Sequence, residues 1–95
     1  GYTVISVDNG ESAIEAVREE RFDLIIMDIE MPIMDGLEVI PHIRKLPHGQ
    51  NTPIIALTAH SLPEKLQKIH EVGGADYLLK PFDEDKLQQI IDRYL

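Results

Sequence analysis

Two short runs of wholly apolar residues constrain the fold of this chain more than any other feature of its sequence. Leu24–Met27 and Ile54–Leu57 contain no polar side chain, which is typical of strands that are buried on both faces. Before the first run, Ala13, Ile14, Ala16 and Val17 form one apolar stripe at helical spacing. Between the two runs, Leu37, Ile40 and Ile43 repeat at helical spacing as well. The alternation of buried strands and amphipathic helices predicts an α/β fold with a parallel sheet, right-handed crossovers and helices on both faces.

The other elements are expected around these two strands. Further strands are expected at Thr3–Val7 and Tyr77–Leu79, and helices at Ser12–Arg21, from about Gly36, from Ser61 to Gly73 and from Asp83 onwards. Ser61-x-x-Glu64 has the pattern of a capping box, which predicts the start of the third helix. Pro41 falls inside the second helix, where we expect it to kink the axis.

Size and charge limit the classes of protein that this chain can represent. Its 95 residues, of which 43% are apolar, are enough for one compact domain. Nine basic and seventeen acidic residues give a net charge of −8, which disfavours direct binding to nucleic acid or to a membrane surface. No cysteine, signal peptide or membrane-length apolar run is present. We therefore expect a soluble cytoplasmic protein.

A carboxylate, a hydroxyl and an ammonium group follow three of the expected strands. Asp28 comes directly after Leu24–Met27, Thr58 comes after Ile54–Leu57, and Lys80 comes after the last strand. Because ligands bind at the carboxyl ends of strands in parallel α/β sheets, these three side chains are candidates for one site. Each of them alone is more often a cap or a solvated side chain, but the three together favour a function.

This set of groups suits phosphoryl transfer to a carboxylate. Asp28 can act as a nucleophile that forms an acyl phosphate. Lys80 would place a positive charge, and Thr58 a hydrogen-bond donor, against the phosphoryl oxygens, while a divalent cation would normally bridge Asp28 and the phosphoryl group.

Three segments around these residues make the chain similar to a known family. The segments are Met27–Gly36 (MDIEMPIMDG), Ala56–Ala59 (ALTA) and Tyr77–Phe82 (YLLKPF). Asp28 and Thr58 are separated by 30 positions, and Thr58 and Lys80 by 22. The chain resembles the receiver domain of response regulators in two-component signalling. This resemblance implies a flavodoxin-like, doubly wound parallel sheet.

The resemblance also implies roles for individual residues. Asp28 would accept a phosphoryl group from the phosphohistidine of a histidine kinase or of a histidine phosphotransfer protein. Mg²⁺ would be bound by Asp28 and by the backbone carbonyl of Glu30. Thr58 and Lys80 would hold the phosphoryl group.

Two further implied features concern the segment around Lys80. Tyr77 would be the aromatic switch residue whose rotamer reports the state of Thr58. The Lys80–Pro81 peptide bond would be cis, a form that is accessible mainly before proline.

The chain departs from the family at its N-terminal end. The family's first strand, which ends in an acidic pair that binds the metal, and its first helix have no counterpart here. We therefore expect one N-terminally truncated, receiver-like domain over residues 1–95, with an incomplete fold. Binding of Mg²⁺ is expected to be weak or absent.

Two arrangements are open where the family's first strand would lie. Either a gap remains between Thr3–Val7 and Leu24–Met27, or these strands pair directly and bring Asp8 close to Asp28. We favour the gap, because dense cores resist the helix shift that closure requires. The uncovered sheet face then predicts self-association or dependence on a partner that fills it.

Three functions remain open from the sequence. The favoured one is a phosphorylatable regulatory domain, not a turnover enzyme, which could be part of a hybrid histidine kinase. The second is a receiver-derived interaction module that cannot be phosphorylated. The third is a haloacid-dehalogenase-type phosphatase, which also uses an aspartate after a strand but carries Asp where this chain has Glu30.

Overall fold

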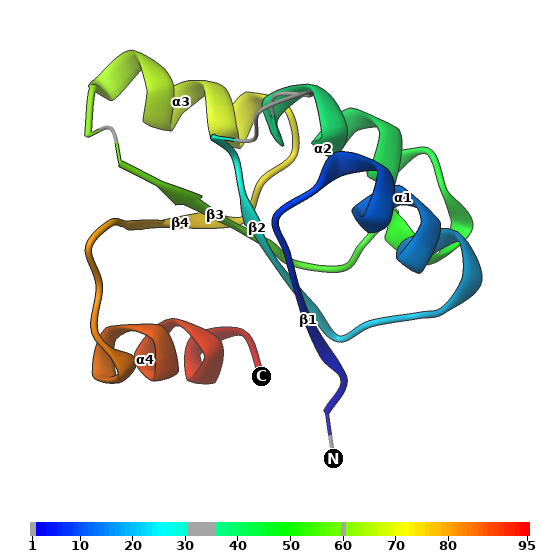
Figure 1. The fold of residues 1–95 in the computed structure, drawn as a ribbon. Coiled ribbons are helices and arrows are strands. Elements are labelled where there is room, and N and C mark those ends of the chain that lie inside the picture. Colours follow the sequence, from blue (N-terminus) through cyan, green and yellow to red (C-terminus); the bar gives the residue numbers. More distant parts are fainter. Residues whose placement is uncertain (1, 31–35, 60) are drawn as a thin grey trace.

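The core of the fold is a sheet of four parallel strands arranged in the order in which they occur along the chain (Figure 1). The protein is described from a computed structural model, which covers residues 2–30, 36–59 and 61–95. The strands are β1 (Val4–Val7), β2 (Leu24–Asp28), β3 (Ile54–Thr58) and β4 (Asp76–Leu79). Each pairs in parallel with the next along the sheet. The expected parallel α/β sheet is therefore confirmed.

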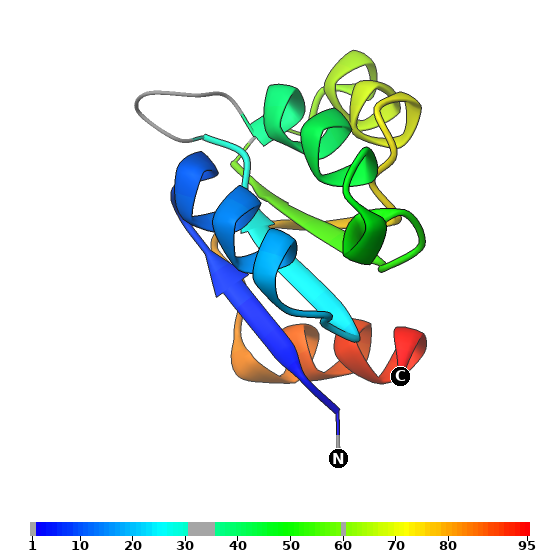
Figure 2. The same cartoon turned by 90° about the vertical axis from the view of Figure 1, so that its right-hand side faces the viewer.

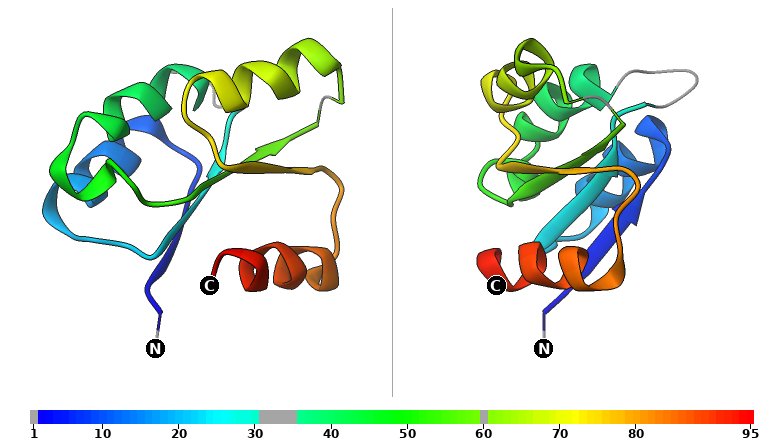
Figure 3. Two further views of the ribbon diagram at one scale, coloured as in Figure 1. Left: turned by 180° about the vertical axis from the view of Figure 1, so that it is seen from behind. Right: turned by 90° about the vertical axis from the view of Figure 1, so that its left-hand side faces the viewer.

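Helices cover the two faces of the sheet unequally. The described helices are α1 (Gly10–Glu19), α2 (Gly36–Arg44), a short 3₁₀ helix η1 (Pro47–Gly49), α3 (Pro63–Glu71) and α4 (Glu84–Tyr94). Figures 2 and 3 show α1, α2 and α3 on one face and α4 on the other. Among the described helices, α4 thus covers its face alone.

The apolar runs explain this layered arrangement. Along β2, alternate residues point to opposite faces, so that Ile25 and Met27 pack in one core cluster with residues of α1 and α2. Leu24 and Ile26 pack in another cluster with Ile90 of α4. Burial on both faces is the reason that β2 needs an apolar side chain at each of these positions.

The expected gap in the sheet is absent, and our preference for it was wrong. Strand β1 pairs directly with β2, with Val4 opposite Leu24 and Val7 opposite Met27. Direct pairing gives hydrogen-bond partners to backbone groups that a gap would leave without them. Helix α1 accommodates this arrangement because Ala13 and Val17 pack into the same cluster as residues of α2.

Two helices differ in detail from the sequence-based expectation. Helix α3 begins at Pro63 and its N-cap is Leu62, which makes no side-chain cap bond, so the predicted capping box at Ser61 is wrong. Proline at the first helical position needs no hydrogen bond from its nitrogen and already has a helical φ. Helix α2 extends from Gly36 to Arg44 with Pro41 inside it.

Candidate functional site

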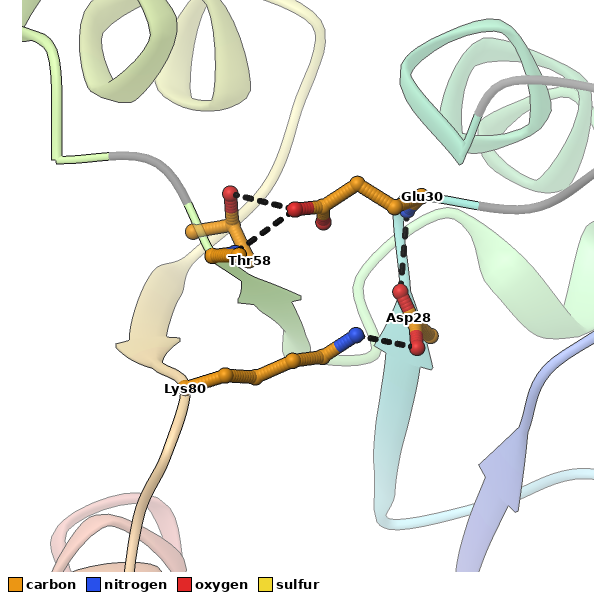
Figure 4. A network of polar contacts seen from close by, with 5 residues as sticks. Asp28, Glu30, Thr58 and Lys80 are labelled. Carbon is orange, nitrogen blue, oxygen red and sulfur yellow. Dashed lines mark hydrogen bonds and ion pairs between the residues drawn. The ribbon is translucent and has the colours of Figure 1, made fainter.

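The three candidate residues meet at the carboxyl edge of the sheet, as expected. Asp28 is the last residue of β2, Thr58 is the last residue of β3, and Lys80 directly follows β4. In the register of the sheet Asp28 lies opposite Leu57, and Thr58 lies opposite Leu79. Figure 4 shows their side chains converging from three neighbouring strands.

Asp28 and Lys80 form an ion pair that bridges the end of β3. The Lys80 Nζ atom lies 2.5 Å from Asp28 Oδ2, and the two side chains are 33% and 25% exposed, respectively. The other carboxylate oxygen, Oδ1, accepts a hydrogen bond from the backbone N–H of Glu30 at 2.9 Å. Asp28 is therefore held by a cation on one side and by its own loop on the other, while it remains accessible to solvent.

A glycine fixes where the loop after Asp28 rejoins the core. The backbone N–H of Gly36 donates to the carbonyl of Ile29 at 3.1 Å. A Cβ atom at position 36 would lie only 2.5 Å from the Cα atom of Ile29, so the approach requires glycine. Ile29 is itself buried, and this anchors the chain just beyond Asp28. Residues 31–35 of the quoted motif lie outside the described residues.

The side chain of Glu30 reaches across to the end of β3. Its Oε1 atom accepts hydrogen bonds from the backbone N–H of Ala59 at 2.6 Å and from the Thr58 hydroxyl at 3.5 Å. The sequence analysis assigned a role only to the backbone carbonyl of Glu30 and missed this use of the side chain. Its position two residues after Asp28, on a loop beside β3, is the signal that could have suggested it.

Backbone contacts set the position of Lys80. Its N–H donates to the carbonyl of Thr58 at 2.8 Å, which continues the pairing of β3 and β4 by one residue. The peptide bond between Lys80 and Pro81 is cis. Thr58 is fully buried, so the end of β3 is packed in the core next to the partly exposed ion pair.

Tyr77 lies apart from the other candidate residues. It lies on the edge strand β4, in register with Ala56 of β3, and is 37% exposed. Together with Leu66, Ile69 and His70 it lines a small hollow between β4 and α3. The structure therefore places Tyr77 beside α3 with part of its ring in solvent.

The oxygen atoms near Asp28 suit a magnesium ion only in part. Mg²⁺ prefers oxygen ligands and commonly takes one or two carboxylates together with water. Asp28 and the Glu30 carbonyl are oxygen donors of this kind, and Asp8 follows β1 at the strand end next to that of Asp28. In the described parts of the chain no group of three or more His, Asp or Glu side chains is placed to hold a metal ion. Asp28 and the Glu30 carbonyl would therefore supply only part of the oxygen ligands of a magnesium ion.

Comparison with known proteins identifies the family of this chain. The family model of the response regulator receiver domain matches residues 1–92. The chain therefore belongs to the response regulator receiver domain family, which is regulatory and acts in two-component systems. The fold class and the resemblance inferred from the sequence are confirmed.

Curated relatives include histidine kinases. The signal transduction histidine-protein kinase BarA of Escherichia coli K12 is 45% identical over 87 residues, which are 92% of this chain and 10% of BarA. The sensor histidine kinase GacS of Pseudomonas protegens is 42% identical over 94 residues, which are 96% of this chain and 10% of GacS. The chain spans about a tenth of the length of these relatives.

Solved structures agree with this assignment. The chemotaxis response regulator CheY4 of Vibrio cholerae is 37% identical, with a TM-score of 0.89 over the whole of this chain and 79% of CheY4. The receiver domain of the sensor histidine kinase PA1611 of Pseudomonas aeruginosa is 38% identical, with a TM-score of 0.83, and the match covers 93% of this chain and 72% of that domain. That receiver domain has a magnesium ion coordinated in its active site cleft. In this chain, none of the helices in the described ranges has the length and apolar character needed to span a membrane.

Proposed function

We propose that this chain is the phosphoacceptor domain of a two-component phosphorelay and that Asp28 receives the phosphoryl group. The observation that carries this proposal is the ion pair between Lys80 Nζ and Asp28 Oδ2 at 2.5 Å, beside the Thr58 hydroxyl. A partly exposed carboxylate that faces a lysine ammonium group at the carboxyl edge of a parallel sheet is suited to receive an anionic group. Membership of the receiver family supports the same role.

The transfer itself is a displacement at phosphorus. A carboxylate oxygen of Asp28 forms a bond to phosphorus while the bond between phosphorus and the imidazole nitrogen of a phosphohistidine breaks. The imidazole leaves with the electron pair of that bond, and Asp28 becomes an acyl phosphate. Such a step requires positioning and charge stabilisation more than covalent assistance from the protein.

The neighbours of Asp28 would supply that stabilisation. Lys80 can move its ammonium group from the carboxylate to a phosphoryl oxygen, and the Thr58 hydroxyl can donate to another. Mg²⁺, bound by Asp28 and the Glu30 carbonyl, would neutralise charge on the phosphoryl oxygens. The backbone N–H of Glu30 keeps the carboxylate oriented, because it already donates to Asp28 Oδ1.

Thr58 and Tyr77 are the proposed switch residues. When the Thr58 hydroxyl turns towards a phosphoryl oxygen, the space available to a side chain next to β4 would change. Tyr77 lies there, partly exposed beside α3. A more buried Tyr77 ring would alter the surface formed by β4 and α3. A partner that binds this surface would then distinguish the two states.

The proposed acceptor is tested by locating the phosphate. The chain is incubated with phosphoramidate and Mg²⁺, and the modified residue is mapped by mass spectrometry. We expect an acid-labile phosphate on Asp28 and none in Asp28→Asn, whereas the exposed control Asp85→Asn retains it. Equal phosphorylation of Asp28→Asn would disprove the assignment. Repeated turnover of p-nitrophenyl phosphate would instead indicate the phosphatase alternative.

One observation favours the second candidate, an interaction module that is not phosphorylated. Among the residues that the structure describes, no three carboxylates or histidines are grouped for a metal ion. Beryllofluoride with Mg²⁺ separates the two candidates, because it mimics a phosphoryl group on a competent aspartate. Shifts of the amide resonances of Asp28 and Thr58 support the phosphoacceptor, and unchanged resonances support the module.

The proposed partners follow from the same chemistry. A histidine kinase or a histidine phosphotransfer protein would supply the phosphohistidine, and the relatives BarA and GacS are histidine kinases. Self-association through the face of β1 that α4 leaves uncovered is also proposed, since Tyr2 and Val4 are exposed there. Sedimentation at increasing concentration tests this, and a monomer throughout would contradict it.

A further inference from the structure

The side chain of Glu30 links two strand ends at the candidate site. It extends from the loop after β2 to the end of β3, where its Oε1 atom lies 2.6 Å from Ala59 N and 3.5 Å from Thr58 Oγ1 (Figure 4). The shorter of these distances is typical of a hydrogen bond to a charged acceptor. The Glu30 carboxylate thus accepts hydrogen bonds from a backbone amide and from a hydroxyl at the edge of the site.

These two donors are the kind that binds an oxyanion. A backbone N–H and a neighbouring hydroxyl, close to a lysine ammonium group, can each donate to one oxygen of a tetrahedral anion. Thr58 is fully buried, and its hydroxyl and the backbone N–H of Ala59 each have a single hydrogen to donate. The Glu30 carboxylate and an incoming anion would therefore compete for the same donors.

Electrostatics reinforce this competition. Asp28 already carries a negative charge within the site, and its only ion-pair partner in the described part of the chain is Lys80. After transfer, the acyl phosphate carries about two negative charges at neutral pH, where the carboxylate carried one. Keeping the Glu30 carboxylate next to such a group would cost more free energy than releasing the side chain to solvent. The Glu30 backbone would stay beside Asp28 in either case, because its N–H donates to the Asp28 side chain.

We propose that the Glu30 carboxylate is a resident anion that occupies the oxyanion donors of Thr58 and Ala59 and has to leave before a phosphoryl group can bind there. This inference rests on the proposed phosphoacceptor function and names the residue that limits access to that same site. Glu30 acts here as a positioning residue, because it controls the donors and does not itself touch phosphorus. Its departure removes the acceptor that these two donors share.

The first measurement follows the donors themselves. Inorganic phosphate is titrated into the wild type, Glu30→Gln and Glu30→Ala, and the amide resonance of Ala59 is followed by NMR. We expect phosphate to shift this resonance at a concentration about tenfold lower in Glu30→Ala than in the wild type, because the competing charge-assisted bond is gone. Glu30→Gln should fall between them, since its amide oxygen is a neutral acceptor of the same shape.

The second measurement follows the covalent step. A carboxylate oxygen of Asp28 forms a bond to the phosphorus of phosphoramidate as the phosphorus–nitrogen bond breaks. The nitrogen, which is already protonated at neutral pH, leaves as ammonia with the electron pair of that bond. We expect the initial rate of this transfer to rise several-fold in Glu30→Gln and further in Glu30→Ala. Glu38→Gln, which removes the same charge from an exposed position of α2, should react like the wild type.

The outcomes separate this inference from the proposed function. Equal phosphate affinity at Ala59 in the wild type and Glu30→Ala overturns the inference, and so does an equal rate of phosphorylation. A rise in rate that Glu38→Gln shares also overturns it, because the rate would then depend on the net charge of the protein and not on the position of Glu30. If no variant carries phosphate on Asp28, the proposed function fails. The titration with inorganic phosphate, followed at the Ala59 amide, still decides whether Glu30 competes with an anion for these donors.

Discussion

The two ends of the sheet hold their charged side chains in opposite ways. At the carboxyl end, Lys80 binds the Asp28 side chain, and Glu30 binds donors on β3. At the amino end, Arg44 donates to the backbone carbonyls of Gly49, Thr52 and Gly73 over 2.6–3.2 Å. Side-chain pairs can exchange partners, whereas a guanidinium bound to fixed carbonyls cannot.

Burial reinforces this difference. Desolvation lowers the pKa of Arg44 from its ordinary value, because the guanidinium is partly removed from water among the carbonyls of Gly49, Thr52 and Gly73. Nearby, the buried Thr52 hydroxyl is 3.0 Å from the carbonyl of His48 and 3.3 Å from that of Phe22. The amino end is therefore built to fix loops, while the carboxyl end keeps its charges available for an incoming group.

The largest expected effect comes from removing Arg44. In Arg44→Met the carbonyls of Gly49, Thr52 and Gly73 lose their charged donor, and we expect the free energy of unfolding to fall by about 2–4 kcal/mol. Urea denaturation measures this change. Arg18→Met, an exposed control on α1, should lose less than about 0.5 kcal/mol. A similar loss in both variants would show that the amino end is not specially fixed.

Removing Lys80 should affect phosphorylation more than stability, which is the reverse of the effect expected for Arg44. In Lys80→Met we expect phosphorylation of Asp28 by phosphoramidate to slow by about tenfold or more, because the cation facing the phosphoryl oxygens is lost. The free energy of unfolding should change by less than about 1 kcal/mol, since the pair is partly exposed. Lys68→Met on α3 serves as the control. A large loss of stability with an unchanged rate would contradict the comparison.

Gly73 provides a finer test of the amino end. Its φ of 110° is strained for any residue with a side chain, and a Cβ atom there would lie 3.2 Å from the Cγ and Nε atoms of Arg44. We expect Gly73→Ala to lower the free energy of unfolding by about 1 kcal/mol. In the background of Arg44→Met the same substitution should cost less. Equal costs in both backgrounds would mean that Gly73 and Arg44 act independently.

The smallest expected effect concerns pH. Burial, followed by the hydrogen bond and the charge of Asp76, raises the pKa of Tyr94 above its ordinary value near 10. The protonated phenol lies 3.1 Å from the carbonyl of Ala75 and 3.0 Å from Asp76 Oδ2. Because the pKa is higher in the folded state, this stabilisation is complete below pH 10 and is lost as the pH rises through the folded-state pKa.

The difference in unfolding free energy between the wild type and Tyr94→Phe measures this contribution. We expect the wild type to be the more stable below pH 10, with the difference shrinking at higher pH. The comparison cancels the effects of pH that both proteins share. A difference that grows above pH 10 would show that the sign is wrong.

The sequence predicted those parts of the molecule that depend on local pattern. The apolar runs located β2 and β3, and the residues after each strand located Asp28, Thr58 and Lys80. Contacts between residues far apart in the chain were not predictable, because Glu30 meets Ala59, and Arg44 meets Gly73, only once the sheet has formed. The pairing of β1 with β2 was mispredicted for a similar reason.

That pairing shows where pattern-based reasoning fails. The sequences of β1 and β2 are compatible with a gap or with direct pairing, and the choice depends on how α1 packs against α2. The start of α3 was mispredicted on a smaller scale. There the fixed φ of Pro63 set the first helical position, although Ser61 and Glu64 have the spacing of a capping box.

Among the helices in the described ranges, α4 alone covers one face of the sheet, and this has a consequence for the order of folding. Leu24, Ile26 and Ile55 are shielded in a cluster with Ile90 of α4, the most C-terminal of the described elements. During synthesis these strand residues are made long before the helix that covers them. A nascent chain that ends before Glu84 therefore exposes an apolar sheet face, which favours aggregation or chaperone binding until α4 emerges and docks.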